Sequence, residues 1–106
     1  MTQFSNPEDQ KLLTLAQATL KRSGAPQAAA LRDNTGRTYV AINIATPTLT
    51  LSACDSVFTV AMASGISGIE SVVVVGEKPS TPGALRDFSA SATLFYCADN
   101  GDISTL

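Results

Sequence analysis

The chain has 106 residues, of which 44% are hydrophobic and 15% are charged, a composition typical of a globular domain and not of a disordered segment. Seven Lys and Arg residues against nine Asp and Glu give a net charge of -2 without a basic run, which argues against nucleic acid as a partner. Because the N-terminus is polar and no apolar run is long enough to cross a membrane, we expect one cytoplasmic domain over residues 1–106.

The first predicted element is a helix that begins at Pro7. Asn6 is a suitable N-cap, and Pro7 suits the first helical position. Apolar residues then recur at spacings of three and four, and Gly24 supplies the stop after a cationic last turn. One face of this helix is therefore expected to pack against the rest of the domain.

Two extended segments follow, over residues 28–32 and 38–44. The sequence Asp-Asn-Thr-Gly at residues 33–36 is typical of a turn and predicts that these segments form an antiparallel hairpin. A second helix is predicted from Ser52 to Ser64, ending at Gly65, with apolar residues on more than one side. Residues 69–75 contain four consecutive valines, which predicts a central strand covered on both faces.

After Gly76, we expect a short helix or turn over residues 85–88, a strand over 92–97 and a turn at 99–102. Arg86 and Asp87 are expected to form a solvated pair on the short helix. This order of elements predicts an α/β fold, a three-layer sandwich with a mixed sheet of four to five strands flanked by helices.

Residues 43–65 run N-I-A-T-P-T-L-T-L-S-A-C-D-S-V-F-T-V-A-M-A-S-G. This segment resembles the core of a small cytidine deaminase, and a weaker similarity extends over about residues 10–105. In that family a strand reading Asn-x-Glu-Asn holds the ribose hydroxyls through its first Asn and its Glu. Asn43 matches that Asn and is our candidate ligand-binding residue, whereas Ala45 replaces the Glu.

The resemblance also places a Cys-Ala-Glu triplet at the start of the second helix, where the Cys binds zinc and the Glu carries protons. Counting back from Gly65 puts Ser52 on the cysteine position and Cys54 on the glutamate position. A shift by two residues puts Cys54 on the ligand position, but Ser56 then falls on the glutamate. Neither register keeps both functions, so Ser52 and Cys54 are relic positions.

The second half of the family's metal site, Pro-Cys-x-x-Cys, should lie within residues 78–88. One alignment puts Pro82 and Leu85 on the cysteine positions, and another puts Lys78 and Thr81 there. The resemblance implies zinc, but the chain has no histidine and only two cysteines, fewer ligands than a catalytic zinc site needs. We therefore expect no metal site, no cofactor and no catalytic residue.

Several of these residues also have structural interpretations. Ser52 and Asp55 can form a capping box at the start of the second helix. Cys54 at the same helix end is a candidate nucleophile, although no histidine is available as its base. Cys97, on an apolar strand, is expected in the core. Asn43 either binds a ligand hydroxyl or ends its strand by bonding to local backbone.

These observations favour a non-catalytic cytidine deaminase-like protein that acts as an assembly or regulatory partner. Because the family packs as dimers and tetramers around the helix corresponding to residues 52–64, we expect a homodimer or homotetramer. Two alternatives remain: a module around Asn43 that binds a nucleoside weakly, and an enzyme with altered chemistry at Cys54. Because the chain ends at Leu106, we also expect the family's last helix to be absent or vestigial.

Overall fold

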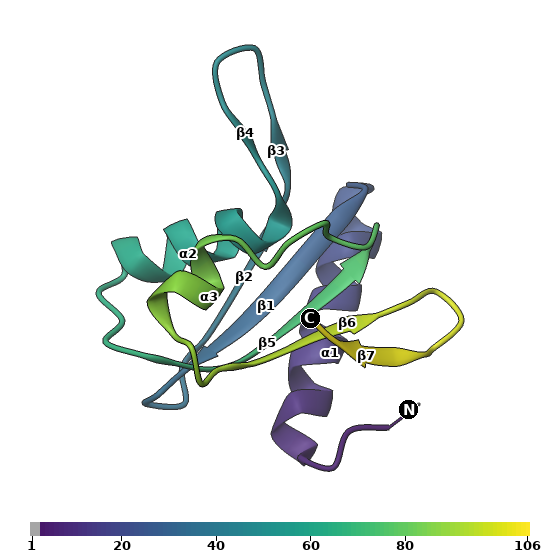
Figure 1. Cartoon of the computed structure of the whole chain (residues 1–106). Coiled ribbons are helices and arrows are strands. Elements are labelled where there is room, and N and C mark those ends of the chain that lie inside the picture. Colours follow the sequence, from purple (N-terminus) through teal and green to yellow (C-terminus); the bar gives the residue numbers. More distant parts are fainter. Residues whose placement is uncertain (1–2) are drawn as a thin grey trace.

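The computed structural model describes residues 3–106, which form a sheet between two layers of helices (Figure 1). One layer is α1 (Pro7–Ser23), and the other contains α2 (Ala53–Ala63) and α3 (Ala84–Phe88). The five strands of the sheet are β1 (Gln27–Asp33), β2 (Thr38–Ile42), β5 (Ile69–Gly76), β6 (Thr93–Cys97) and β7 (Ile103–Thr105), in the order β2-β1-β5-β6-β7. The predicted α/β sandwich with a mixed sheet is confirmed.

The ends of α1 form as the sequence predicts. The side-chain oxygen of Asn6 accepts a hydrogen bond from the backbone N–H of Glu8, at 2.9 Å. At the other end, Gly24 adopts the left-handed conformation (φ 68°) and donates its N–H to the carbonyl of Leu20. Glycine adopts this conformation without a steric cost, so the helix stops there.

The central strand is β5, as the valine run predicts. It pairs antiparallel with β1 on one side and parallel with β6 on the other. Its alternate valines face opposite layers, with Val72 and Val74 on the side of α2 and Val73 and Val75 on the side of α1. Both faces of the strand are therefore buried over residues 72–75, which explains why this stretch is apolar without interruption. The start of β5 differs, since it contains the exposed Glu70 and the buried Ser71.

Two strand pairings were not predicted from the sequence. The strand predicted over residues 38–44 is interrupted at Asn43, so β2 ends at Ile42 and a separate hairpin follows, made of β3 (Ile44–Ala45) and β4 (Thr50–Leu51). The strand β7, which pairs antiparallel with β6 across the predicted turn at residues 99–102, was also not predicted.

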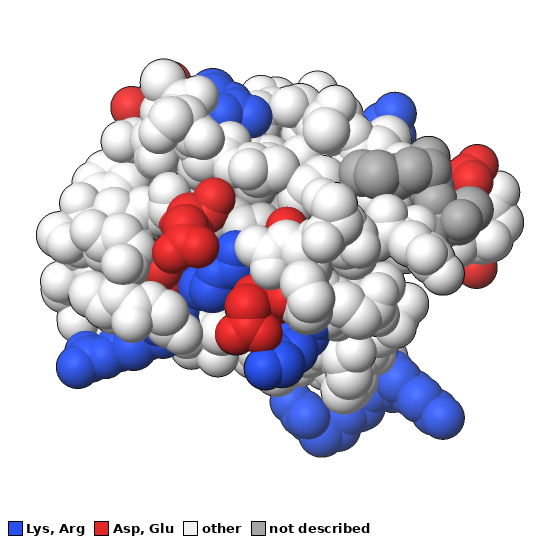
Figure 2. Space-filling model, turned by 90° about the horizontal axis from the view of Figure 1, so that it is seen from below, with Lys and Arg blue, Asp and Glu red and all other residues white. Residues whose placement is uncertain are grey.

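Arg32 carries a buried charge at the edge between α1 and the sheet. It is only 6% exposed, and its guanidinium lies 3.0 Å from the carboxylate of Asp9 on α1 and 3.3 Å from that of Glu70 on β5. Figure 2, which views the molecule from below, shows a basic group flanked by acidic ones near its centre. Since an unpaired buried charge would be strongly destabilising, these two carboxylates are needed for Arg32 to be buried.

The expectation of a solvated Arg86–Asp87 pair is wrong for Arg86. Its guanidinium donates to the carbonyls of Ala90 and Ala92, each at 2.9 Å, and to that of Leu106 at 3.4 Å. Arg86 therefore ties α3 to the start of β6 and to the residue after β7.

No helix within residues 3–106 is long and apolar enough to cross a membrane.

Candidate functional site: the junction of α2 and α3

Four of the residues singled out by the sequence lie where α2 and α3 begin: Ser52, Cys54, Asp55 and Leu85. Ser52 caps α2, because its hydroxyl oxygen accepts a hydrogen bond from the backbone N–H of Asp55 at 3.2 Å. The first four N–H groups of a helix have no partner within the helix, so such contacts determine whether the helix end is stable. The capping interpretation of Ser52 is therefore confirmed.

The other half of the predicted capping box is wrong. The Asp55 carboxylate does not return to Ser52 but accepts a hydrogen bond from the backbone N–H of Ala84, the first residue of α3, at 3.2 Å. Gly83, which precedes it, has φ 60°, and a Cβ there would lie 2.6 Å from the Asp55 oxygen. Glycine at this position thus lets α3 approach α2 closely enough for the N–H of Ala84 to donate a hydrogen bond to Asp55.

Gln27, the first residue of β1, also belongs to this junction, although the sequence did not predict a role for it. Its side-chain oxygen accepts from the N–H of Ala53 at 2.7 Å, and its amide nitrogen donates to the carbonyl of Glu77 at 2.8 Å. This buried amide therefore links β1, the start of α2 and the end of β5. No local pattern marks Gln27, since its two partners lie far away in the sequence.

Asn43 forms two hydrogen bonds with the backbone of Gln27. Its side-chain oxygen accepts from the N–H of Gln27 at 3.2 Å, and its own N–H donates to the carbonyl of Gln27 at 3.3 Å. Of the two interpretations left open by the sequence, this arrangement matches a residue that ends its strand.

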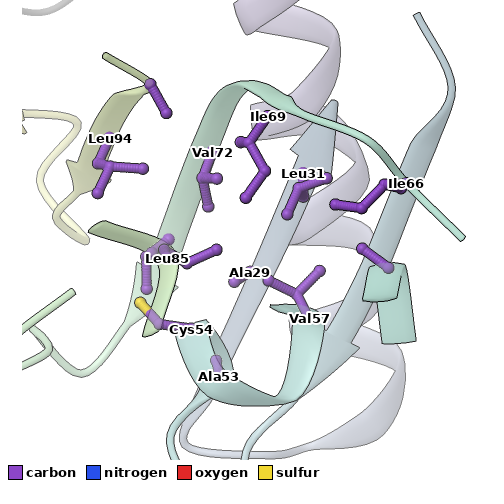
Figure 3. Close-up of a cluster of buried hydrophobic side chains, with 13 residues drawn as sticks. Ala29, Leu31, Ala53, Cys54, Val57, Ile66, Ile69, Val72, Leu85 and Leu94 are labelled. Atoms are coloured by element: carbon purple, nitrogen blue, oxygen red, sulfur yellow. The ribbon is translucent and has the colours of Figure 1, made fainter. Parts of the chain in front are cut away.

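Cys54 is buried in the core cluster between α2 and the sheet, and Figure 3 shows its side chain next to that of Leu85 from α3. Both residues are 0% exposed. Burial, together with the nearby charge of Asp55, raises the pKa of the Cys54 thiol from 9.0 to about 12. The thiol is thus neutral at physiological pH, whereas a nucleophile needs the thiolate.

Of the residues aligned with the second half of the metal site, Leu85 alone packs against Cys54 in the core cluster. Leu85 is fully buried, and Pro82 is half-buried just before α3. Lys78 and Thr81, from the other alignment, are exposed in the preceding loop. Within residues 3–106 no group of three or more Cys, His, Asp or Glu side chains could hold a metal ion.

A separate pocket of about 300 Å³ lies on the opposite face of the sheet. Its walls include Leu20 and Lys21 of α1, Val75 of β5, Cys97 of β6 and the following Asp99. Cys97 is 3% exposed, so its predicted place in the core is confirmed. None of the residues that carry the sequence resemblance lines this pocket.

Comparison with known proteins identifies the family of the chain. Residues 5–101 match the family described as cytidine deaminase-like, so the chain belongs to that family. No curated protein sequence matches it significantly.

Two solved structures show the same fold. A cytidine deaminase from Burkholderia pseudomallei superposes with a TM-score of 0.75 at 21% identity, over 92% of this chain and 90% of the other. A cytidine deaminase from Mycobacterium leprae superposes with a TM-score of 0.70 at 19% identity, over 91% of both chains. At these identities the similarity establishes the fold, and the chemistry has to be argued from the residues.

Proposed function

We propose that this protein is a non-catalytic member of the cytidine deaminase-like family that acts as an assembly or regulatory partner. The observation that supports this proposal most directly is the packing of Cys54 against Leu85 at the junction of α2 and α3. The family's metal ligands are expected at this junction, and here two buried side chains fill it.

The chemistry of the available groups argues in the same direction. Hydrolytic deamination needs a hydroxide at neutral pH, which a metal ion provides by lowering the pKa of its bound water, and a group that transfers the proton to the leaving amine. The candidate donors at the junction are a serine hydroxyl that caps a helix and a thiol whose pKa is raised to about 12. Leu85 offers no donor atom, so these residues do not fit a zinc ion.

The carboxylate of Asp55, which is the acid closest to these residues in sequence, is also engaged. It accepts the N–H of Ala84 and thereby holds α3 against α2. Asp55 therefore has a structural role at this junction.

An assembly role is supported by the outer surface of the α2 layer. Phe58 of α2 and Phe88 of α3 meet edge to face, with ring centroids 5.7 Å apart, and Phe88 is 37% exposed. Val60 and Met62 add further exposed apolar surface to α2. Self-association into a homodimer or homotetramer would cover such side chains, which a small domain otherwise leaves in water.

The test combines metal analysis with a turnover assay. Protein purified without chelator is expected to contain no stoichiometric zinc and to convert neither cytidine nor deoxycytidine to the uridine product above background. The Mycobacterium leprae enzyme, assayed in parallel, is the positive control. One zinc per chain, or turnover, would overturn the proposal, and loss of that turnover in Cys54→Ala would instead support chemistry at the thiol.

The nucleoside-binding alternative is tested separately by thermal shift with cytidine. No shift is expected at about 1 mM ligand, where a site with a millimolar Kd would add only about 0.4 kcal/mol. A larger stabilisation in the wild type that is absent in Asn43→Ala would favour a binding module over an assembly partner.

A further inference from the structure

The hairpin formed by β3 and β4 extends away from the sheet and the helices (Figure 1). We refer to residues 44–51 as the arm. Its two strands pair with each other and not with the five-stranded sheet. The turn of the arm is closed by a backbone hydrogen bond from Thr46 to Leu49 at 2.9 Å, and the Thr46 hydroxyl accepts from the N–H of Leu49 at 3.0 Å.

The register of the arm places unpaired backbone groups on its edges. Thr46 and Leu49 form a hydrogen-bonded pair, and the next pair is Ala45 with Thr50. Because the two kinds of pair alternate in an antiparallel ladder, the N–H and C=O groups of Ala45 and Thr50 point outward. Both residues are exposed. Such an edge is a template for a further strand, and a hairpin of two strands is by itself only marginally stable in water.

The arm lies in a part of the chain that is almost free of charge. Between Arg37 and Glu70 the only charged residue is Asp55, and its carboxylate is bonded to Ala84. Four large apolar side chains are exposed in the described chain: Leu49, Val60, Met62 and Phe88. The first three belong to this charge-poor segment. Natural edge strands are usually protected by lysines or other charges, and the arm has none.

A second copy of this chain is the partner that such a surface fits. At a twofold axis each residue meets its own copy, so a charged side chain near the axis would face a like charge. An uncharged arm avoids this repulsion and can pair with itself. A partner that recognised the arm through complementary charge would find no charged side chain on it.

We propose that two copies associate by antiparallel pairing of their β4 strands about a twofold axis near Thr50, which joins two arms into a four-stranded ribbon. The β4 edge is the better candidate because β4 leads directly into α2 and lies on the α2 side of the arm (Figure 1). A second arm added there would lie on the same side of the first arm as α2. This pairing rests on the assembly role proposed above. Its test does not use metal content or turnover, so the pairing and the absence of catalysis can be refuted independently.

Sedimentation equilibrium with two proline variants tests this geometry. Wild-type protein is expected to reach at least twice the 11.0 kDa of one chain at micromolar concentration. Thr50→Pro removes an outward N–H without removing a hydrogen bond of the arm itself, and is expected to give a folded monomer. Ala45→Pro makes the same change on the opposite edge and is expected to keep the assembly. A monomeric wild type, an associated Thr50→Pro, or a monomeric Ala45→Pro would each overturn the proposal.

Cross-linking provides a second measurement that does not depend on proline. Both native thiols are buried, so Thr50→Cys adds a single accessible one. In a hydrogen-bonded pair across the axis, the two Cα atoms would lie about 5.5 Å apart, within the range for a disulfide. Mild oxidation is expected to link Thr50→Cys into dimers and to leave Asn100→Cys, in the exposed β6–β7 turn, unlinked. Equal cross-linking of the two variants would contradict the proposed axis.

Discussion

The reactivity of the Cys54 thiol distinguishes two hypotheses: that buried side chains fill the junction of α2 and α3, and that Cys54 carries an altered enzymatic chemistry. The experiment uses Cys97→Ala, in which Cys54 is the only thiol, and treats it with iodoacetamide at pH 8. Because the pKa of Cys54 is raised from 9.0 to about 12, its thiolate is about 1,000-fold scarcer at this pH than that of an ordinary thiol. Cys54 is also 0% exposed, so the reagent reaches it only when the structure opens.

Intact-mass spectrometry follows the alkylation in buffer and in denaturant. We expect labelling in buffer to be at least about 1,000-fold slower than in denaturant, where both the burial and the raised pKa are lost. Glutathione in each solvent serves as the reference for the intrinsic rate. Labelling of folded protein at a rate close to that of glutathione would refute the burial argument and would restore Cys54 as a candidate nucleophile.

The same raised pKa predicts how stability depends on pH. The folded state favours the neutral thiol, so this contribution to the free energy of unfolding is complete below pH 9 and is lost as the pH rises towards 12. Denaturant unfolding of Cys97→Ala should therefore show a fall in stability above pH 9. The double variant that also carries Cys54→Ala should show a smaller fall, and identical slopes would contradict the shift.

Two further predictions concern packing. Leu85→Ala should lower the free energy of unfolding by about 2 to 5 kcal/mol, because Leu85 is fully buried at the junction. Leu85→Met, which nearly preserves the side-chain volume, should lower it by less than about 1.5 kcal/mol. Equal losses for the two variants in denaturant unfolding would show that shape at this position is unimportant. Phe58→Asp should dissociate the assembly or unfold the chain, since it places a charge against Phe88 and the core cluster. A folded Phe58→Asp variant of unchanged mass in sedimentation would remove the outer face of α2 from the interface.

The elements that could be predicted from sequence have local signals. Asn6 and Gly24 mark the ends of α1, and the valine run marks β5 as a strand buried on both faces. The arm could not be predicted in this way, because residues 38–44 have a continuous strand pattern. The interruption at Asn43 arises from its contact with Gln27, a residue on another strand that no local pattern connects to it.

The same distinction applies to the junction. The cap made by Ser52 is local and was predicted, whereas the contact of Asp55 with Ala84 spans 29 positions and replaced the local bond expected from a capping box. The burial of Cys54 depends on where Leu85 of α3 packs. Residue types therefore indicated which positions differ from the family pattern, and the tertiary contacts determined what those positions do instead.

These contacts hold the junction together through hydrogen bonds and packing among the chain's own residues. The first N–H groups of a helix need acceptors, and three side chains provide them here: Gln27 for Ala53, Ser52 for Asp55, and Asp55 for Ala84. The three acceptors come from β1, the segment before α2, and α2 itself, so they also hold those elements together. On the proposal that the junction holds no metal, these bonds and the Cys54–Leu85 contact supply its packing. Mutations that remove ligands would then be tolerated, while mutations that remove these acceptors would destabilise the domain.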